Sequence, residues 1–299
     1  MAASGDFIIH QSSRLHYHRW GKGEKLLLCF HGYGESAGTF SLLAEPLGDE
    51  FTIVAIDMPL HGKTEWNEGL DFSIHQLLSV IDAILAGIEG PSSGASQHLA
   101  GMLPATIIDP PPASRLAQTP WHLLGYSMGG RIALSLLEAA PEKIQKLILI
   151  APDGLRLNPW YWLATQTHAG RLLFWYTLYH PGWFLFMLKT GNKLKLVNPS
   201  VYKFVDNYIG KHEVRRELYT RWTTMRHFRP HLEHIKAIIR KKNLPVRILY
   251  GKFDRIIREE RGRQFQKGIE PWCRLVVLSA GHQLLQTQHL PALVSLVKE

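Results

Sequence analysis

The chain has 299 residues and a formal net charge of +9, and 45% of its residues are hydrophobic. This length and apolar content suffice for one large domain with an insertion, or for two ordinary domains. The two cysteines, Cys29 and Cys273, lie within or at the start of apolar runs typical of strands. We therefore expect no disulfide framework and no cysteine-based metal site.

Apolar runs and amphipathic stripes alternate along most of the chain. After extended segments near 7–9 and 14–20, the pattern predicts strands at 25–31, 51–57, 120–125, 145–151, 244–250 and 273–278, and helices at 73–88, 128–140, 258–268 and 287–298. Such alternation predicts an α/β fold with a mostly parallel central sheet covered by helices on both faces. The first strongly apolar stretch, Leu26 to Phe30, is thus a strand and no secretion signal precedes it, so we expect a cytoplasmic protein.

Two segments interrupt the alternation. Residues 90–119 exceed the few residues that usually join a helix to the next strand, and prolines at 110–112 exclude a helix there. This extra loop is either a surface excursion or part of the border of a pocket or subunit contact. Residues 154–243 form a second interruption, rich in aromatic side chains, between core segments 1–153 and 244–299.

Charge is concentrated in this second interruption. Residues 154–243 contain 16 Lys plus Arg against 4 Asp plus Glu, whereas the rest of the chain has 18 against 21. Solvated helix faces explain many basic residues, but a one-sided excess also attracts anionic partners. Candidates are an anionic or carrier-bound acyl substrate, an acidic protein or a peripheral membrane surface. No nucleic-acid motif accompanies the charge, so we expect no nucleic-acid partner.

The most informative motif is Gly125-Tyr-Ser127-Met-Gly129, at a predicted strand-to-helix junction. A tight turn of this kind forces close backbone contacts, which explains glycine two residues before and two after the serine. The pattern favours Ser127 as a nucleophile. His31, Asp254 and His282 also follow predicted strands, where ligands bind in parallel sheets.

These motifs together resemble the α/β-hydrolase superfamily along nearly the whole chain. Besides the serine motif, the matching segments are Phe30-His-Gly-Tyr-Gly34, Asp57-Met-Pro-Leu-His-Gly62, Gly251-Lys-Phe-Asp254 and Ala280-Gly-His282, in the expected order. The resemblance implies that residues 154–243 are a helical cap inserted after the sixth strand.

The resemblance also implies a catalytic triad of Ser127, His282 and Asp254 in the family's chain order. Asp153, at another strand end, is the rival for the acid. Backbone N–H groups of Tyr33 and Met128 would form the oxyanion hole.

The expected activity is serine hydrolysis of an ester or similar acyl bond in a small, partly apolar substrate, through an acyl-enzyme and without a cofactor or metal. The same triad serves carbon–carbon bond hydrolases, perhydrolases and acyltransferases, so these activities stay open. A non-catalytic ligand-binding protein of the same fold is the alternative from a different class.

Overall fold

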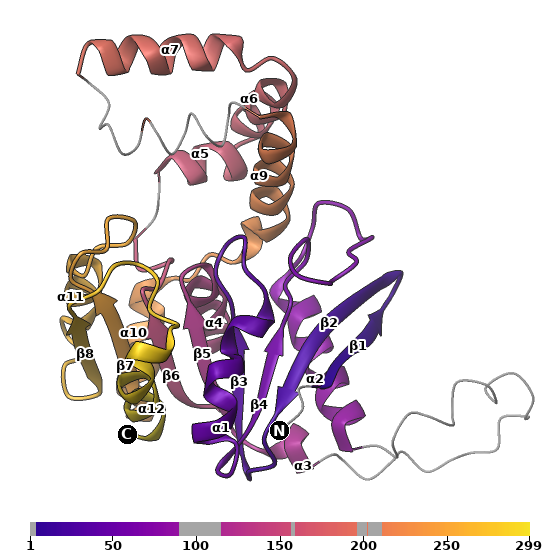
Figure 1. Cartoon of the computed structure of the whole chain (residues 1–299), viewed down its shortest axis with the longest axis vertical. Helices are drawn as coiled ribbons and strands as arrows, with labels where there is room; N and C mark the ends of the chain where they lie inside the picture. The colour runs from indigo at the N-terminus through magenta and orange to yellow at the C-terminus, as the bar shows by residue number, and fades with distance from the viewer. Residues whose placement is uncertain (1–3, 90–114, 157–158, 196–201, 203–210) are drawn as a thin grey trace, which may run out of the picture. The chain divides into compact units, whose positions relative to one another are not determined.

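A computed structural model describes residues 4–89, 115–156, 159–195, 202 and 211–299 (Figure 1). The chain divides into two compact units. The first spans Met1–Asn67, Ser73–Leu155 and Phe228–Glu299, and the second spans Glu68–Phe72 and Arg156–His227.

The first unit is built on an eight-stranded sheet with strand order β1-β2-β4-β3-β5-β6-β7-β8 (Figure 1). Its strands are β1 (Ser4–His10), β2 (Ser13–Trp20), β3 (Lys25–Phe30), β4 (Phe51–Ile56), β5 (Trp121–Tyr126), β6 (Ile144–Ile150), β7 (Val246–Gly251) and β8 (Cys273–Leu278). Strands β4, β3, β5, β6, β7 and β8 pair in parallel. The two extended segments near the N-terminus form an antiparallel hairpin, whose second strand pairs antiparallel with β4.

Helices bury both faces of this sheet, and every residue of β4 and β5 is buried. One face carries a core in which side chains such as Leu27, Cys29 and Ile53 pack against η1 (Ala37–Leu43) and α12 (Leu290–Lys298). Helix α4 (Met128–Ala139) contacts β3, β5 and β6, and α2 (Ile74–Glu89) and α10 (Leu232–Lys242) pack against α4. The predicted fold class is therefore confirmed.

Shorter elements complete the first unit. They are α1 (Ala44–Leu47), α3 (Arg115–Gln118), η2 (Pro141–Lys143), α11 (Glu260–Gln266) and η4 (Thr287–His289). Of the loop expected at 90–119, the part from 90 to 114 lies outside the described residues, and α3 falls in the remainder.

The segment Arg156–His227 of the second unit is helical over most of its described residues. It contains α5 (Pro159–Gln166), α6 (His168–Tyr179), α7 (Gly182–Lys193), α9 (His212–Thr224) and η3 (Met225–His227). Helix α6 packs against α5, α7 and α9. The larger segment of this unit, Arg156–His227, falls between β6 and β7 in sequence and ends at His227, whereas the sequence predicts a boundary at 243. The difference is α10, which belongs to the first unit because Ile235 and Ile239 are fully buried and the helix packs on α4.

Among the described residues, no helix has the length and hydropathy needed to cross a bilayer. The expected cytoplasmic location stays a prediction.

One buried histidine makes the free energy of unfolding depend on pH. His122 on β5 is 7% exposed, and its ring meets Phe51 edge-on at 5.3 Å between centroids. Burial, reinforced by the positive charge of Lys146, lowers the pKa of His122 from 6.5 to about 4. In the unfolded chain this imidazole takes up its proton near pH 6.5. Its contribution to stability is therefore complete above pH 6.5 and is lost as the pH falls toward 4.

We predict that His122→Leu makes the free energy of unfolding less sensitive to acid. Between pH 7 and pH 5 the wild-type protein should lose about 2 kcal/mol more than the variant, because its unfolded state binds a proton that the folded state excludes. Urea unfolding at both pH values measures this difference. His75→Leu, which removes an exposed imidazole from α2, is the control. Equal acid losses in wild-type protein and His122→Leu would contradict the prediction.

Candidate active site

Ser127 lies on the tight turn between β5 and α4. Its backbone has φ 50° and ψ −114°, a conformation that non-glycine residues rarely adopt and that the surrounding structure must hold in place. The Ser127 N–H donates to the Ile150 carbonyl at 2.9 Å, and its carbonyl accepts from the N–H groups of Gly130 at 2.9 Å and Asp153 at 2.8 Å. These bonds tie the turn to β6 and to the loop that follows it.

The flanking glycines are required by close backbone approaches. A Cβ atom at Gly125 would lie 2.4 Å from the Gly129 carbonyl oxygen, and one at Gly129 would lie 1.9 Å from the carbonyl oxygen of Phe30. Both distances are far below van der Waals contact. The start of α4 therefore sits directly against the end of β3, and this contact positions the serine.

His282 bridges Ser127 and Asp254. Its Nε2 atom lies 3.1 Å from Ser127 Oγ, and its Nδ1 atom lies 2.7 Å from Asp254 Oδ2. Asp254 follows β7 and His282 follows β8, so adjacent parallel strands deliver the acid and the imidazole to the same edge of the sheet. Three residues that are far apart in the sequence thus form one continuous chain of hydrogen bonds.

The Asp254 carboxylate is buried and held by several donors. Its Oδ1 atom accepts from the backbone N–H groups of Ile256 at 2.7 Å and Ile257 at 2.9 Å. Burial by itself raises the pKa of Asp254, but hydrogen bonds from His282 and from these two N–H groups outweigh that effect and lower it below its usual value. The carboxylate is therefore ionised at neutral pH.

Asp153, the rival acid, has different partners. One of its carboxylate oxygens lies 3.6 Å from Arg131 Nε, and the other accepts from the Gly154 N–H at 2.8 Å. The structure thus places Asp254 against His282, and Asp153 against Arg131.

The loop after β3 passes close to the serine. A Cβ atom at Gly32 would lie 3.3 Å from Ser127 Cβ. His31 holds this loop, since its Nδ1 atom donates to the Gly32 carbonyl at 2.8 Å and its Nε2 atom accepts from the Met58 N–H at 3.1 Å. Tyr33 follows Gly32, and Met128 is the first residue of α4, where helix N–H groups have no intrahelical acceptor. The two backbone groups expected to bind an oxyanion therefore belong to segments that flank Ser127.

Three further side chains surround His282 and were not singled out from the sequence. Tyr126 Oη donates to the His282 carbonyl at 3.2 Å and lies 3.3 Å from Gln283 Oε1. Glu35 lies close enough to Gln283 and His282 to interact with both, and burial raises the pKa of its carboxyl group. The sequence offered one indication of their role, because each lies within four residues of a motif residue. These side chains are Tyr126, Gln283 and Glu35. Only the tertiary structure brings them together.

Among the described residues, no group of three or more His, Cys, Asp or Glu side chains is arranged to hold a metal ion. The expectation that the chain uses no cofactor stays a prediction.

The sheet, the serine turn and the strand-end loops define an α/β-hydrolase. A family model described as "Serine aminopeptidase, S33" matches residues 21–286, and the chain belongs to this family of α/β-hydrolase enzymes.

Two relatives are similar in sequence to this chain over different lengths. An uncharacterised hydrolase of Bacillus subtilis (strain 168) is 25% identical over 285 residues, which cover 93% of this chain and 90% of the relative. The pimeloyl-[acyl-carrier protein] methyl ester esterase of Aeromonas salmonicida (strain A449) is 25% identical over 154 residues, covering 51% of this chain and 48% of the esterase.

Solved structures show the same fold at lower identity. The enol-lactonase from Burkholderia xenovorans LB400 superposes with a TM-score of 0.60 at 14% identity, covering 98% of this chain and 100% of that one. The thioesterase domain from the curacin biosynthetic pathway has a TM-score of 0.59 at 18% identity, with 100% of both chains covered.

We predict that Gly129→Ala lowers the free energy of unfolding by about 2–3 kcal/mol, because the new methyl group has to displace the Phe30 carbonyl. The matched control is Gly87→Ala in α2, where a Cβ atom meets nothing within 4 Å and alanine favours the helix by about 1 kcal/mol. Urea unfolding of both variants checks the prediction. A Gly129→Ala protein as stable as wild type would show that the helix and strand are not in such close contact.

Proposed function

We propose that this hydrolase cleaves an ester or similar acyl bond of a small, partly apolar substrate with Ser127 as nucleophile. The observation that carries the proposal is the His282 ring, which lies within hydrogen-bond distance of Ser127 Oγ on one side and Asp254 Oδ2 on the other. A serine hydroxyl is a weak nucleophile at neutral pH and needs an adjacent base in this position.

In the proposed reaction Ser127 Oγ attacks the acyl carbonyl carbon while His282 Nε2 takes the hydroxyl proton. Asp254 accepts a hydrogen bond from His282 Nδ1–H, which selects the tautomer with an unprotonated Nε2 and stabilises the imidazolium that forms. The imidazolium then donates its proton to the leaving group, and an acyl-enzyme remains. Water, deprotonated by His282, then attacks the acyl carbon. The bond to Ser127 Oγ breaks, the imidazolium returns the proton to Oγ, and the carboxylic acid product leaves.

The tetrahedral intermediate carries a negative oxygen that needs fixed donors. We assign this role to the backbone N–H groups of Tyr33 and Met128, whose segments flank Ser127. Removing one such donor typically costs about 3 kcal/mol of transition-state stabilisation. The close approach of the Gly32 loop to the serine supports this assignment.

We propose that the second unit acts as a cap that selects the substrate. The basic excess of residues 154–243 supports an anionic or carrier-bound acyl group as substrate, or contact with an acidic protein or membrane surface. A relative that acts on a pimeloyl-[acyl-carrier protein] methyl ester, as its name states, is consistent with the carrier-bound case. Carbon–carbon bond hydrolysis, perhydrolysis and acyl transfer use the same proposed nucleophile and base, so they remain alternative outcomes of substrate screening.

We predict that a fluorophosphonate probe labels the wild-type protein covalently and that Ser127→Ala abolishes the labelling. The probe reacts only with a serine that has been activated by a base. Ser41→Ala, at an exposed position in η1, is the control and should label like wild type. A wild-type protein that stays unlabelled while a reference hydrolase reacts would favour the non-catalytic ligand-binding alternative.

Matched substitutions distinguish which of the two aspartates is the acid that orients His282. We predict that Asp254→Asn lowers kcat on p-nitrophenyl esters about 10⁴-fold, because an amide favours the wrong histidine tautomer. Asp153→Asn, which weakens the contact with Arg131 and keeps an oxygen that can accept from the Gly154 N–H, should change kcat less than about tenfold. Steady-state kinetics across a series of acyl lengths measures both effects. The reverse ranking would reassign the acid to Asp153.

A further inference from the structure

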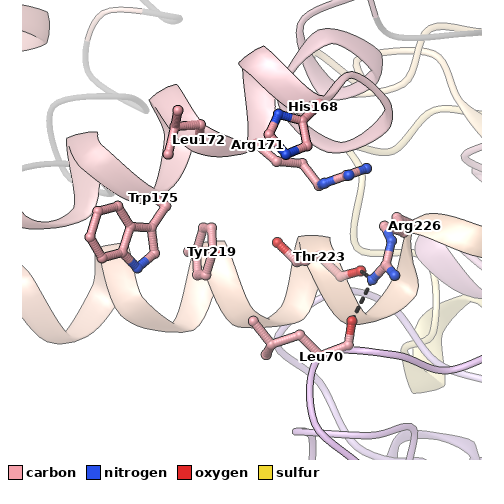
Figure 2. A pocket seen from close by; sticks show the side chains of 8 residues that line it. All are labelled: Leu70, His168, Arg171, Leu172, Trp175, Tyr219, Thr223 and Arg226. Carbon is pink, nitrogen blue, oxygen red and sulfur yellow. Dashed lines mark hydrogen bonds between the residues drawn. The ribbon is translucent and has the colours of Figure 1, made fainter.

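The helical unit contains a pocket of its own, built between α6 and α9. It has a volume of about 380 Å³ and is lined by Leu70, His168, Arg171, Leu172, Trp175, Tyr219, Thr223 and Arg226 (Figure 2). The α6 residues at 168, 171, 172 and 175 follow the spacing of one helix face, as do 219, 223 and 226 along α9 and η3. All eight residues belong to the second unit.

Two arginines, Arg171 and Arg226, give the polar end of the pocket its positive charge. His168 lines the same end, and none of the eight lining residues is acidic. Arg226 is fixed in place, since its Nη1 atom donates to the carbonyls of Leu70 and of Thr223, the latter at 2.8 Å, and its Nη2 atom lies 3.3 Å from Asp71 Oδ1. These contacts use three of the five N–H donors of a guanidinium, so donors remain for a ligand.

Arg171 is held much more loosely than Arg226. Its guanidinium group makes a long contact of 3.5 Å from Nη1 to the Thr165 carbonyl. Figure 2 shows the Arg171 side chain extending from α6 toward the end of the pocket where Arg226 lies. A guanidinium in this position can turn to an incoming anion at little cost, because it gives up only a weak hydrogen bond.

A buried hydroxyl group also lines the pocket. Thr223 is 5% exposed, and its Oγ1 atom has no hydrogen-bond partner among the described residues. The neighbouring Thr224 is also buried without a partner for its Oγ1 atom among the described residues, but it does not line the pocket. Two other buried threonines of this unit, Thr165 and Thr177, bond back along their helix to the carbonyls of Tyr161 and Leu173, both at 2.7 Å. Thr223 instead lines the pocket on the side of α9 that faces α6 (Figure 2). Leaving a buried hydroxyl unpaired costs free energy, and a ligand acceptor would remove that cost.

The other end of the pocket is apolar. Trp175 and Tyr219 form its aromatic wall, together with the exposed side chain of Leu172 (Figure 2). The Trp175 ring packs against Tyr179 at 5.3 Å between centroids, and Tyr219 meets Phe174 edge-on at 5.1 Å. An apolar or aromatic group can bind there without reordering these rings.

We propose that this pocket binds an amphipathic organic anion, with a carboxylate or phosphate group at Arg171, Arg226 and Thr223 and an acyl or aryl portion against Trp175 and Tyr219. Arginine forks suit both anions because they donate two parallel hydrogen bonds, and the threonine hydroxyl supplies a further donor. A fully hydrated inorganic ion has no apolar portion to place against the aromatic wall, so we expect it to bind less tightly than an amphipathic anion. This binding does not depend on the proposed reaction at Ser127.

Calorimetric titration of the full chain carrying Ser127→Ala tests the proposal without any contribution from turnover. The probes are octanoate, octyl phosphate, the neutral isostere 1-octanol and inorganic phosphate. At least one of the two amphipathic anions should bind at least tenfold more tightly than both 1-octanol and inorganic phosphate. The tighter of the two anions identifies the preferred head group. If 1-octanol binds as tightly as the better anion, or if neither amphipathic anion gives a heat of binding, the proposal is wrong.

Two further variants locate the binding. Arg171→Gln should weaken binding of the anions at least fivefold and leave binding of 1-octanol unchanged. The isosteric Thr223→Val should weaken binding of the anions about threefold, which is within the range for one lost hydrogen bond. Arg216→Gln, which removes the same charge from an exposed position on α9, is the matched control and should bind like its parent. Circular dichroism checks that each variant is folded. Anion binding that is unaffected by both Arg171→Gln and Thr223→Val, or reduced equally by Arg216→Gln, would overturn the assignment to this pocket.

Discussion

The close contact between Gly129 and the Phe30 carbonyl is the constraint on which the site depends. It brings the first turn of α4 against the end of β3, and it is possible only because Gly129 lacks a side chain. With the helix in this position, the chain must leave β5 through a turn in which Ser127 has a positive φ. The hydrogen bond from Ser127 N–H to Ile150 then ties that turn to β6, so the serine is fixed by three neighbouring strands.

Parallel pairing explains why the other groups arrive at the same place. The loops that follow β3, β5, β7 and β8 all leave from the same edge of the sheet, and they carry Gly32, Ser127, Asp254 and His282. Burial in such a place would normally favour a neutral carboxylic acid. The two backbone N–H groups after Asp254, together with His282, reverse that preference and keep the carboxylate charged. Glu35, which has fewer donors, keeps a raised pKa in the same neighbourhood.

The helical unit follows a different logic from the sheet unit. Some of its cationic and aromatic side chains line the pocket formed by α6, α9 and η3, where Arg226 and Tyr219 contact neighbours within the unit. Its basic character is therefore partly organised into a pocket rather than spread over solvated helix faces. We infer that the helical unit recognises anions independently of the active site. The proposed hydrolysis would use this pocket only if the substrate has the same chemistry as the pocket ligand.

The sequence by itself determined the alternation of strands and helices, the parallel sheet and the turn at Ser127, because these depend on local periodicity and on glycines required by short-range backbone contacts. It also indicated the segment that forms most of the second unit, but not the place of α10, whose buried isoleucines pack on α4. Tertiary structure alone decided which aspartate faces His282, since Asp153 and Asp254 both follow strands and differ only in their spatial neighbours. The same holds for Glu35 beside His282 and for the pocket between α6 and α9. Each joins side chains from segments distant in sequence, and no local pattern encodes such contacts.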